Sequence, residues 1–288
     1  MRKKRLAYLY VAPLTAFILL IVFLSISESI KQSFGIFEAI GMNEFTLKYY
    51  KEVLSGEEFK NSFIFCLRYS LISSAISVIL GTVIAIYIKR NNDNFSYSVL
   101  RLSIIIPHMV VGFIIFGMLS KTGLISRILY SLGLINSMDQ FPNLIYDRDG
   151  ISLIISFVYK EFCFIAFTLV AVLKRIKDEY RDQSYVLGAN KIKTFFYVTL
   201  PMILPNILYS FIVIFSFSFS SYELSNILGP STPKSLATIA YNYYTSPLLT
   251  DRPYAMVYNS ILLLVGLVAF IIFVLVYRKV VIKEATYE

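Results

Sequence analysis

Charged and aromatic side chains inside long apolar runs are the residues of this sequence that could do chemistry. Lys160 and Glu161 lie near the middle of a run from Ile151 to Leu173, and Tyr159 precedes them. A charge inside a membrane costs at least about 2.5 kcal/mol on insertion scales, so such side chains usually face a partner or a wet cavity. Neighbours on a helix point about 100° apart, so Lys160 and Glu161 can hardly both line one pathway. A pathway role and a polar contact with a neighbouring helix are equally open.

A second pair of candidate side chains, Tyr222 and Glu223, follows a long charge-free run. Carboxylates and aromatic rings attract cationic solutes, so this pair, like Glu161 with Tyr159, is a candidate for a substrate pathway. For Tyr222 or Glu223 taken alone, a solvated helix end is the better interpretation. The single histidine, His108, excludes a two-histidine metal motif, and we expect no catalytic residue, metal site or cofactor in this chain.

Residues 174–199 form a polar loop between two apolar runs, and its residue types indicate two short helices that meet at a turn. Asp178 is expected to cap the first helix, because a carboxylate accepts hydrogen bonds from the free N–H groups of a helix start. Gly188 is expected to end it, since glycine enters the left-handed conformation without steric cost. Pro201 then bends or starts the next long helix. A compact helical protrusion of this kind is a natural contact for a partner protein.

Long apolar helices must position these residues. Of the 288 residues, 57% are apolar and 16% are charged, whereas a soluble domain carries roughly 25% charged residues. A span of the hydrocarbon core of a bilayer takes about 20 apolar residues. We therefore predict an all-α integral membrane protein with one transmembrane domain over residues 1–288. Its six spans are expected at about residues 6–27, 61–88, 102–120, 151–173, 200–222 and 253–277.

Lys and Arg residues are unevenly divided between the two ends of these spans. With both chain ends inside, the inner segments hold 16 of the 27 Lys and Arg residues and the outer segments hold 9. Cytoplasmic loops carry such an excess, so we predict a multi-pass cell-membrane protein, embedded in lipid, with cytoplasmic N and C termini. The same bias explains the net charge of +9 without nucleic-acid binding. The first apolar run is expected to be an uncleaved span rather than a signal peptide, because it is long and no small-residue cleavage site follows it.

The polar loop resembles the loop of a known family. Permease subunits of ATP-binding-cassette (ABC) importers carry Glu-Ala-Ala, three residues, Gly, nine residues and Ile-x-Leu-Pro. This chain keeps the spacing with Asp182, Gln183, Ser184, Gly188, Ala189, Leu200 and Pro201. The Glu-Ala-Ala triplet differs in identity, although Asp182 keeps the acid and Ser184 keeps a small side chain. The resemblance implies that these residues couple the chain to an ATPase.

The resemblance also implies partners. The sequence holds no phosphate-binding loop motif, so ATP would be bound and hydrolysed by two separate ATPase subunits docked on the loop. A second permease, identical or homologous, would complete the translocation pathway. An extracytoplasmic solute-binding protein would deliver the solute. The chain itself is expected to be a transport subunit and not an enzyme.

The transported solute is predicted from finer similarities. Within the family, residues 45–55 and the Leu228-Gly-Pro stretch are most similar to the polyamine-type group, so we predict spermidine or putrescine. Sugar, phosphonate and ferric iron are the alternatives for the same machinery. An autonomous secondary transporter or channel, a different class, would use an ion gradient and need no ATPase. A membrane enzyme is the least favoured class, because the sequence offers one histidine and no paired carboxylates on one apolar face.

Overall fold

The computed structural model describes residues 2–279, and the side chains of residues 10–279. Regular structure in this part of the chain is helical, apart from one isolated bridge between Phe37 and Met42. The helices are α1 (Arg2–Ser33), α2 (Lys48–Ser55), α3 (Glu57–Asn91), α4 (Asn94–Ile105), α5 (His108–Leu119), α6 (Leu124–Ser131), α7 (Ile151–Leu173), α8 (Asp178–Val186), α9 (Lys191–Thr194), α10 (Leu200–Ser220), α11 (Glu223–Leu228), α12 (Leu236–Tyr244) and α13 (Arg252–Tyr277). The predicted all-α fold is confirmed.

Six helical segments are long and apolar enough to cross a membrane within the described residues. They are Tyr10–Ser33, Glu57–Asn91, His108–Ser131, Ile151–Leu173, Lys191–Ser220 and Leu249–Tyr277. The fourth segment has the expected bounds, and the other five differ from them. Polar turns extend α3 at both ends, and the fifth segment includes α9 and a π-helical turn, Phe195–Thr199, before α10 begins at Leu200.

The described chain forms two compact units. One contains the residues up to Lys60 together with Ile239–Leu263, and the other contains Asn61–Thr238 together with the residues from Leu264 onward. In the first unit, tyrosine rings pack closely, with centroid distances of 4.9 Å between Tyr49 and Tyr254 and 5.4 Å between Tyr243 and Tyr254. The Tyr254 hydroxyl donates a hydrogen bond to Glu52. This unit therefore combines aromatic rings with a carboxylate.

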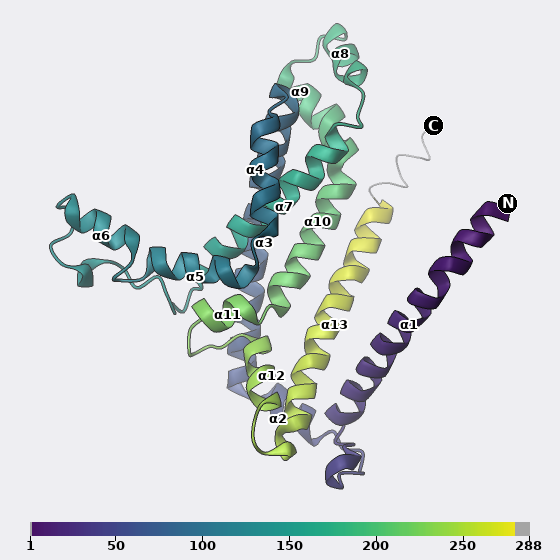
Figure 1. The fold of residues 1–288 in the computed structure, drawn as a ribbon, viewed down its shortest axis with the longest axis vertical. Helices are drawn as coiled ribbons and strands as arrows, with labels where there is room; N and C mark the ends of the chain where they lie inside the picture. Colours follow the sequence, from purple (N-terminus) through teal and green to yellow (C-terminus); the bar gives the residue numbers. More distant parts are fainter. Residues whose placement is uncertain (1, 280–288) are drawn as a thin grey trace. The chain divides into compact units, whose positions relative to one another are not determined.

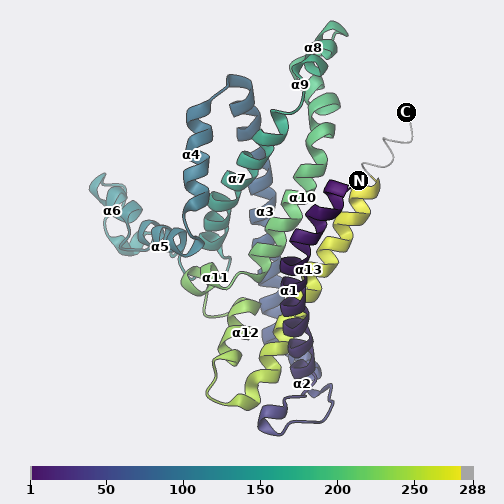
Figure 2. The same cartoon turned by 45° about the vertical axis from the view of Figure 1, so that its right-hand side comes forward.

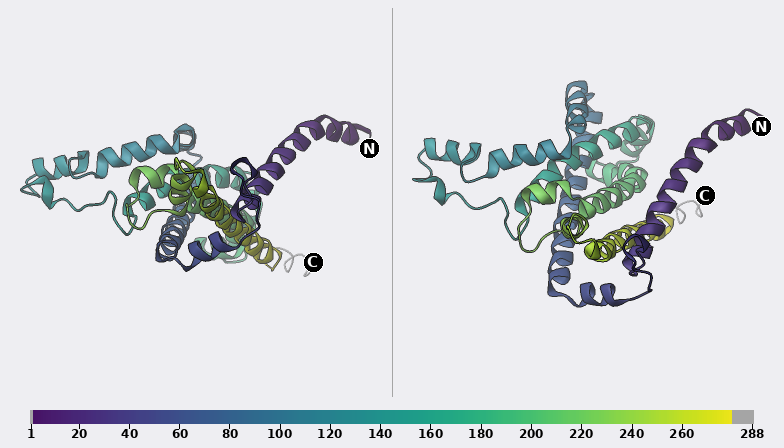
Figure 3. Two further views of the ribbon diagram at one scale, coloured as in Figure 1. Left: turned by 90° about the horizontal axis from the view of Figure 1, so that it is seen from below. Right: turned by 60° about the horizontal axis from the view of Figure 1, so that its bottom comes forward.

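The second unit is built around α7. Figures 1 and 2 show α3, α4, α7 and α10 side by side, with α5 and α6 running transverse to them, and Figure 3 shows α5 and α6 extending away from these helices. Buried side chains from all four helices form one apolar core, including Ala85, Leu100, Leu169 and Ile203. Helix α7 has the greater part of its length enclosed by protein, so charged residues on it meet helices rather than lipid.

Helices α3 and α7 approach closely at Gly81. A Cβ atom at this position would lie 2.7 Å from the Ile165 Cβ atom and 3.0 Å from the Phe162 carbonyl oxygen. A methyl group there must push the two helices apart, since the backbone carbonyl cannot rotate away.

We therefore expect Gly81→Ala to lower the free energy of unfolding by about 1 to 3 kcal/mol, the usual cost of overpacking. The matched control is Gly266→Ala in α13, where a Cβ atom meets nothing within 4 Å. Denaturant unfolding in detergent, followed by circular dichroism, measures both variants. Equal stability of the two variants would contradict the close approach of α3 and α7.

The expected continuous span at residues 102–120 is interrupted. Helix α4 ends at Ile105, Ile106 is extended with ψ of 124°, and α5 begins at His108 after Pro107. Proline has no N–H and disfavours the helical conformation in the residue before it, which explains the break.

The start of α4 is fixed by Asp93, whose carboxylate accepts hydrogen bonds from the Ser96 hydroxyl and N–H. These bonds stabilise the carboxylate and lower the pKa of Asp93.

Candidate functional site

Lys160 holds the broken end of α4. Its ammonium group is 2.8 Å from the Ser103 carbonyl oxygen and 2.9 Å from that of Ile104, and it also donates to the Ile106 carbonyl. The last carbonyls of a helix have no partner within the helix, and they carry partial negative charge. The side chain of Lys160 is 5% exposed, so a buried cation from α7 satisfies the carbonyls that Pro107 leaves free.

Glu161 faces the other side of the break. Its Oε1 atom lies 3.2 Å from Nε2 of His108, the first residue of α5. Glu161 is 6% exposed, and the His108 ring packs against Phe217 of α10 at 4.7 Å between ring centroids. Adjacent residues on α7 therefore contact the two helices on either side of Pro107. Both side chains make polar contacts with neighbouring helices, which is one of the two roles that the sequence leaves open for Lys160 and Glu161.

The remaining pathway candidates lie in different settings. Tyr159 is 38% exposed and makes an edge contact with Phe162, at 6.3 Å between ring centroids. Tyr222 precedes α11, and Glu223 is the exposed first residue of that helix. The acid on α7 is buried and the acid on α11 is exposed, so the structure does not give the two acids a common environment.

The polar loop has the two short helices that the sequence predicts. Helix α8 ends at Val186, and Gly188 follows with φ of +84°, in the left-handed region. The N–H of Ala189 donates to the Ser184 carbonyl oxygen at 3.0 Å. The Ser184 hydroxyl is 2.7 Å from that of Thr194 in α9, and this bond is buried. The turn at Gly188 therefore folds α9 back against α8.

The predicted capping role of Asp178 is wrong. Lys177 is the residue before α8 and its side chain makes no capping bond, whereas Asp178 is already the first helical residue. The Asp178 carboxylate lies 3.2 Å from the Lys89 ammonium and 3.4 Å from the Arg181 guanidinium. The Asp178 carboxylate therefore forms ion pairs with two cations and does not accept hydrogen bonds from the free N–H groups of α8. Asn190 caps the second helix instead, accepting a hydrogen bond from the Lys193 N–H.

The outward face of α8 is partly apolar. Val186 and Leu187 are 88% and 87% exposed at its end. A hollow of about 490 Å³ on this face is lined by Glu179, Asp182, Gln183, Val186 and Leu187. Exposed apolar residues rimmed by polar ones mark sites of protein interaction when they lie outside the lipid. Leu200 and Pro201 are half-buried in the first turn of α10.

Two sets of contacts in the site could not be predicted from the sequence. The Lys160 contacts join residues 54 to 57 positions apart, and the Lys89 contact with Asp178 joins residues 89 positions apart. The contact of Lys160 with the end of α4 has one signal in the sequence, which is a proline within an apolar run together with a lysine within another.

Comparison with known proteins identifies the family. Residues 77–282 match the model of the family described as binding-protein-dependent transport system inner membrane component. The chain belongs to this family. The match includes α7, the loop and α10, so it confirms the resemblance to ABC importer permeases that the loop predicts.

Curated relatives match parts of this permease chain. It is 28% identical over 200 residues to the ferric transport system permease protein FbpB of Actinobacillus pleuropneumoniae, covering 68% of this chain and 28% of the relative. It is 30% identical over 108 residues to the spermidine/putrescine transport system permease protein PotC homolog of Mycoplasma pneumoniae, covering 36% of each chain. The permease thus spans about a third of the length of these relatives.

A solved structure shares the fold over almost the full length. It is that of a bacterial ABC transporter involved in the import of the acidic polysaccharide alginate, with a TM-score of 0.73 and 19% sequence identity. The match covers 96% of this permease chain and 97% of that chain. At this identity the likeness establishes the fold.

Proposed function

We propose that the chain is the transmembrane permease subunit of an ATP-driven solute importer and forms half of the translocation pathway. Two separate ATPase subunits bind and hydrolyse ATP. A second permease, identical or homologous, supplies the other half, and an extracytoplasmic solute-binding protein delivers the solute. The excess of Lys and Arg on the α8 side supports an orientation with both chain ends in the cytoplasm.

The outward face of α8 carries this proposal. Val186 and Leu187 expose apolar side chains beside the acidic residues Glu179 and Asp182. An apolar core with a polar rim is the composition of a protein interface. The bond between Ser184 and Thr194 ties α8 to α9, which leads directly into α10, so a movement of α8 is transmitted to a spanning helix. Family membership supports an ATPase as the docked partner.

We expect the double variant Val186→Asp with Leu187→Asp to lose the ATPase subunit during affinity purification through a tag on this chain. Two buried charges without partners would abolish docking. The matched control is Leu132→Asp with Leu134→Asp, at two residues that are 66% and 68% exposed after α6. The control should retain the ATPase. An intact chain that transports solute with no ATPase would instead support an autonomous transporter.

Polyamine is the proposed solute class. Cationic solutes bind carboxylates by charge and aromatic rings by cation–π contact. The first unit offers both, since the Tyr254 ring packs edge-on against Tyr49 and stacks on Tyr243, and its hydroxyl donates a hydrogen bond to Glu52. Burial, and after it the nearby carboxylates of Glu58 and Asp251, raise the pKa of Tyr243 in the same unit. The similarity to a spermidine/putrescine permease homolog also supports this class.

Uptake of labelled spermidine and putrescine should fall in cells that lack this chain and return when the intact chain is restored. Ferric iron and sugar uptake in the same cells are the controls. If polyamine uptake stayed unchanged while iron or sugar uptake fell, the solute assignment would be wrong and the importer proposal would stand. If uptake of polyamine, iron and sugar all stayed unchanged, the solute assignment and the importer proposal would both be contradicted.

A further inference from the structure

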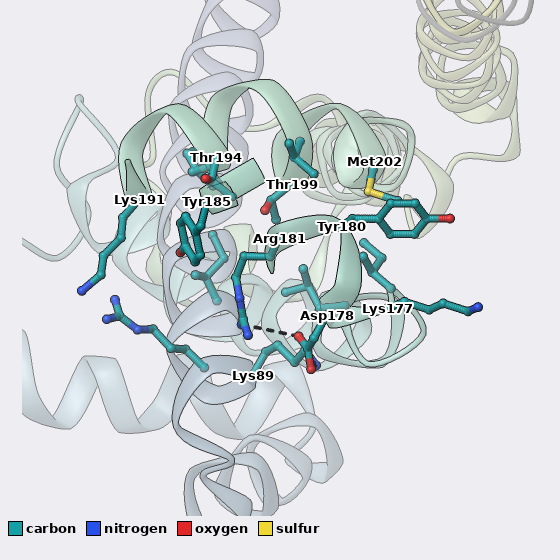
Figure 4. Close-up of a pocket in the computed structure, with 16 residues that line it drawn as sticks. Lys89, Lys177, Asp178, Tyr180, Arg181, Tyr185, Lys191, Thr194, Thr199 and Met202 are labelled. Atoms are coloured by element: carbon teal, nitrogen blue, oxygen red, sulfur yellow. Dashed lines mark hydrogen bonds and ion pairs between the residues drawn. The ribbon is translucent and has the colours of Figure 1, made fainter. Parts of the chain in front are cut away.

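A cavity of about 460 Å³ lies between α8, the last turn of α3 and the start of α10 (Figure 4). Five of its lining residues are basic: Lys89, Arg90, Lys177, Arg181 and Lys191. Asp178 is the one acidic residue among the described residues that line it. The cavity therefore concentrates positive charge on the inner side of α8, opposite the hollow on its outward face.

Two carboxylates pair with part of this charge. Asp178 is shared between Lys89 at 3.2 Å and Arg181 at 3.4 Å, and Asp182 lies 3.5 Å from the Arg181 guanidinium. Arg90, Lys177 and Lys191 form no ion pair with any side chain in the part of the chain that the structure describes. Three basic groups thus remain available to an anion.

Helix periodicity places the other acids of α8 outside the lining of the cavity. Asp178, Arg181 and Tyr185 are three and four residues apart, so they share the face of α8 that lines it. Glu179 and Asp182 lie on the outward face and line the other hollow. The close-up shows Asp178 and Arg181 joined at the cavity, with the Lys191 side chain extending from α9 (Figure 4).

Part of the remaining lining is apolar and belongs to membrane-spanning helices. Ile86 lies near the end of α3, Leu173 is the last residue of α7, and Met202 is in the first turn of α10. Basic side chains beside apolar ones at the ends of spanning helices can bind a lipid that has an anionic headgroup and apolar chains. A free anion would use only the basic side of such a cavity. Basic pockets between transmembrane helices bind the headgroups of anionic lipids.

We propose that this cavity binds the phosphate-bearing headgroup of an anionic phospholipid. The phosphate lies between Arg90 and Lys191, two of the basic residues without an ion pair, and the acyl chains leave past Ile86 and Met202 into the bilayer. Lys89 and Asp178 link α3 to α8 at the same place, and the bound headgroup adds a second link from α3 to α9, which the bond between Ser184 and Thr194 ties to α8. The position of α8 then depends on the anionic lipid content of the membrane. This inference is independent of the transported solute.

The test is a titration of the full-length chain in detergent with phosphatidylglycerol, with bound lipid counted by native mass spectrometry. Phosphatidylcholine and inorganic phosphate are titrated separately. The test variant is Lys191→Gln, and the matched control is Lys193→Gln, which removes the same charge from the same helix at a residue that does not line the cavity. A double variant, Arg90→Gln with Lys191→Gln, enlarges the effect.

Each basic residue near an anionic lipid surface contributes enough to change affinity about fivefold. We therefore expect Lys191→Gln to weaken phosphatidylglycerol binding about fivefold and the double variant about 25-fold, with Lys193→Gln unchanged. Equal binding by Lys191→Gln and Lys193→Gln would overturn the proposal. So would equal affinity for phosphatidylcholine, or full displacement of phosphatidylglycerol by millimolar phosphate, which would identify a free phosphate site. Loss of bound lipid when the ATPase subunit is added would assign the cavity to the protein interface instead.

Discussion

Lys160→Met should lower the free energy of unfolding by about 3 kcal/mol. The methionine side chain has a similar length but cannot donate, so the carbonyls of Ser103, Ile104 and Ile106 would lose a shared cation at a site enclosed by helices. Hydrogen bonds to charged groups are worth about 1.5 to 3 kcal/mol each, and the loss of one partner from a buried charged contact costs about 3 to 5 kcal/mol.

Denaturant unfolding in detergent measures the loss, with Lys174→Met as the control. Lys174 is exposed and its ammonium lies 4.7 Å from the centroid of the Tyr97 ring, a contact worth about 1 kcal/mol or less at a surface. A second measurement uses Cys163, which is 2% exposed on α7. With Cys66 replaced by serine, maleimide labelling of Cys163 should be faster in Lys160→Met than in the parent. Unchanged stability together with unchanged labelling would contradict the role of Lys160.

Gly188→Val should reduce transport at least tenfold while the protein still inserts. Gly188 has φ of +84°, and a Cβ atom there meets nothing within 4 Å, so the expected effect comes from the backbone alone. A left-handed conformation costs an L-residue roughly 1 to 2 kcal/mol, and β-branched residues enter it least readily. The turn that folds α9 against α8 would open, and α8 would lose its fixed position relative to α10.

The matched control for this experiment is Gly133→Val. Gly133 has φ of +69° after α6 and also has open space around its Cβ position, so the local strain is comparable. Solute uptake in proteoliposomes and the yield of copurified ATPase should fall for Gly188→Val and stay near the parent values for Gly133→Val. Gly188→Asn should recover much of the activity, since asparagine tolerates the left-handed region. Normal uptake and normal ATPase yield in Gly188→Val would refute the coupling role of the loop.

The fold was predictable where local physics decides it. Apolar length identified six spans, and glycine's steric freedom identified the end of α8 at Gly188. Contacts between distant residues were not predictable in the same way. Asp178 was expected to cap α8, but its carboxylate pairs with Lys89 of α3, and no local pattern indicates that α3 ends beside the loop. The absence of Lys, Arg, Asp and Glu over residues 102–120 predicts one continuous span there, although Pro107 ends α4.

The contact between Lys160 and the end of α4 also bears on how the chain is built. Ile106 leaves the ribosome 54 residues before Lys160. While α7 is still unsynthesised, the last carbonyls of α4 have no ammonium group to accept from, and an unsatisfied carbonyl in hydrocarbon costs several kcal/mol. We therefore expect the break at Pro107 to stay at a hydrated depth until α7 inserts. Membrane integration of α4 and α5 is completed only when a later segment arrives, so a nascent chain that stops before Ile151 holds these two helices in an unfinished state.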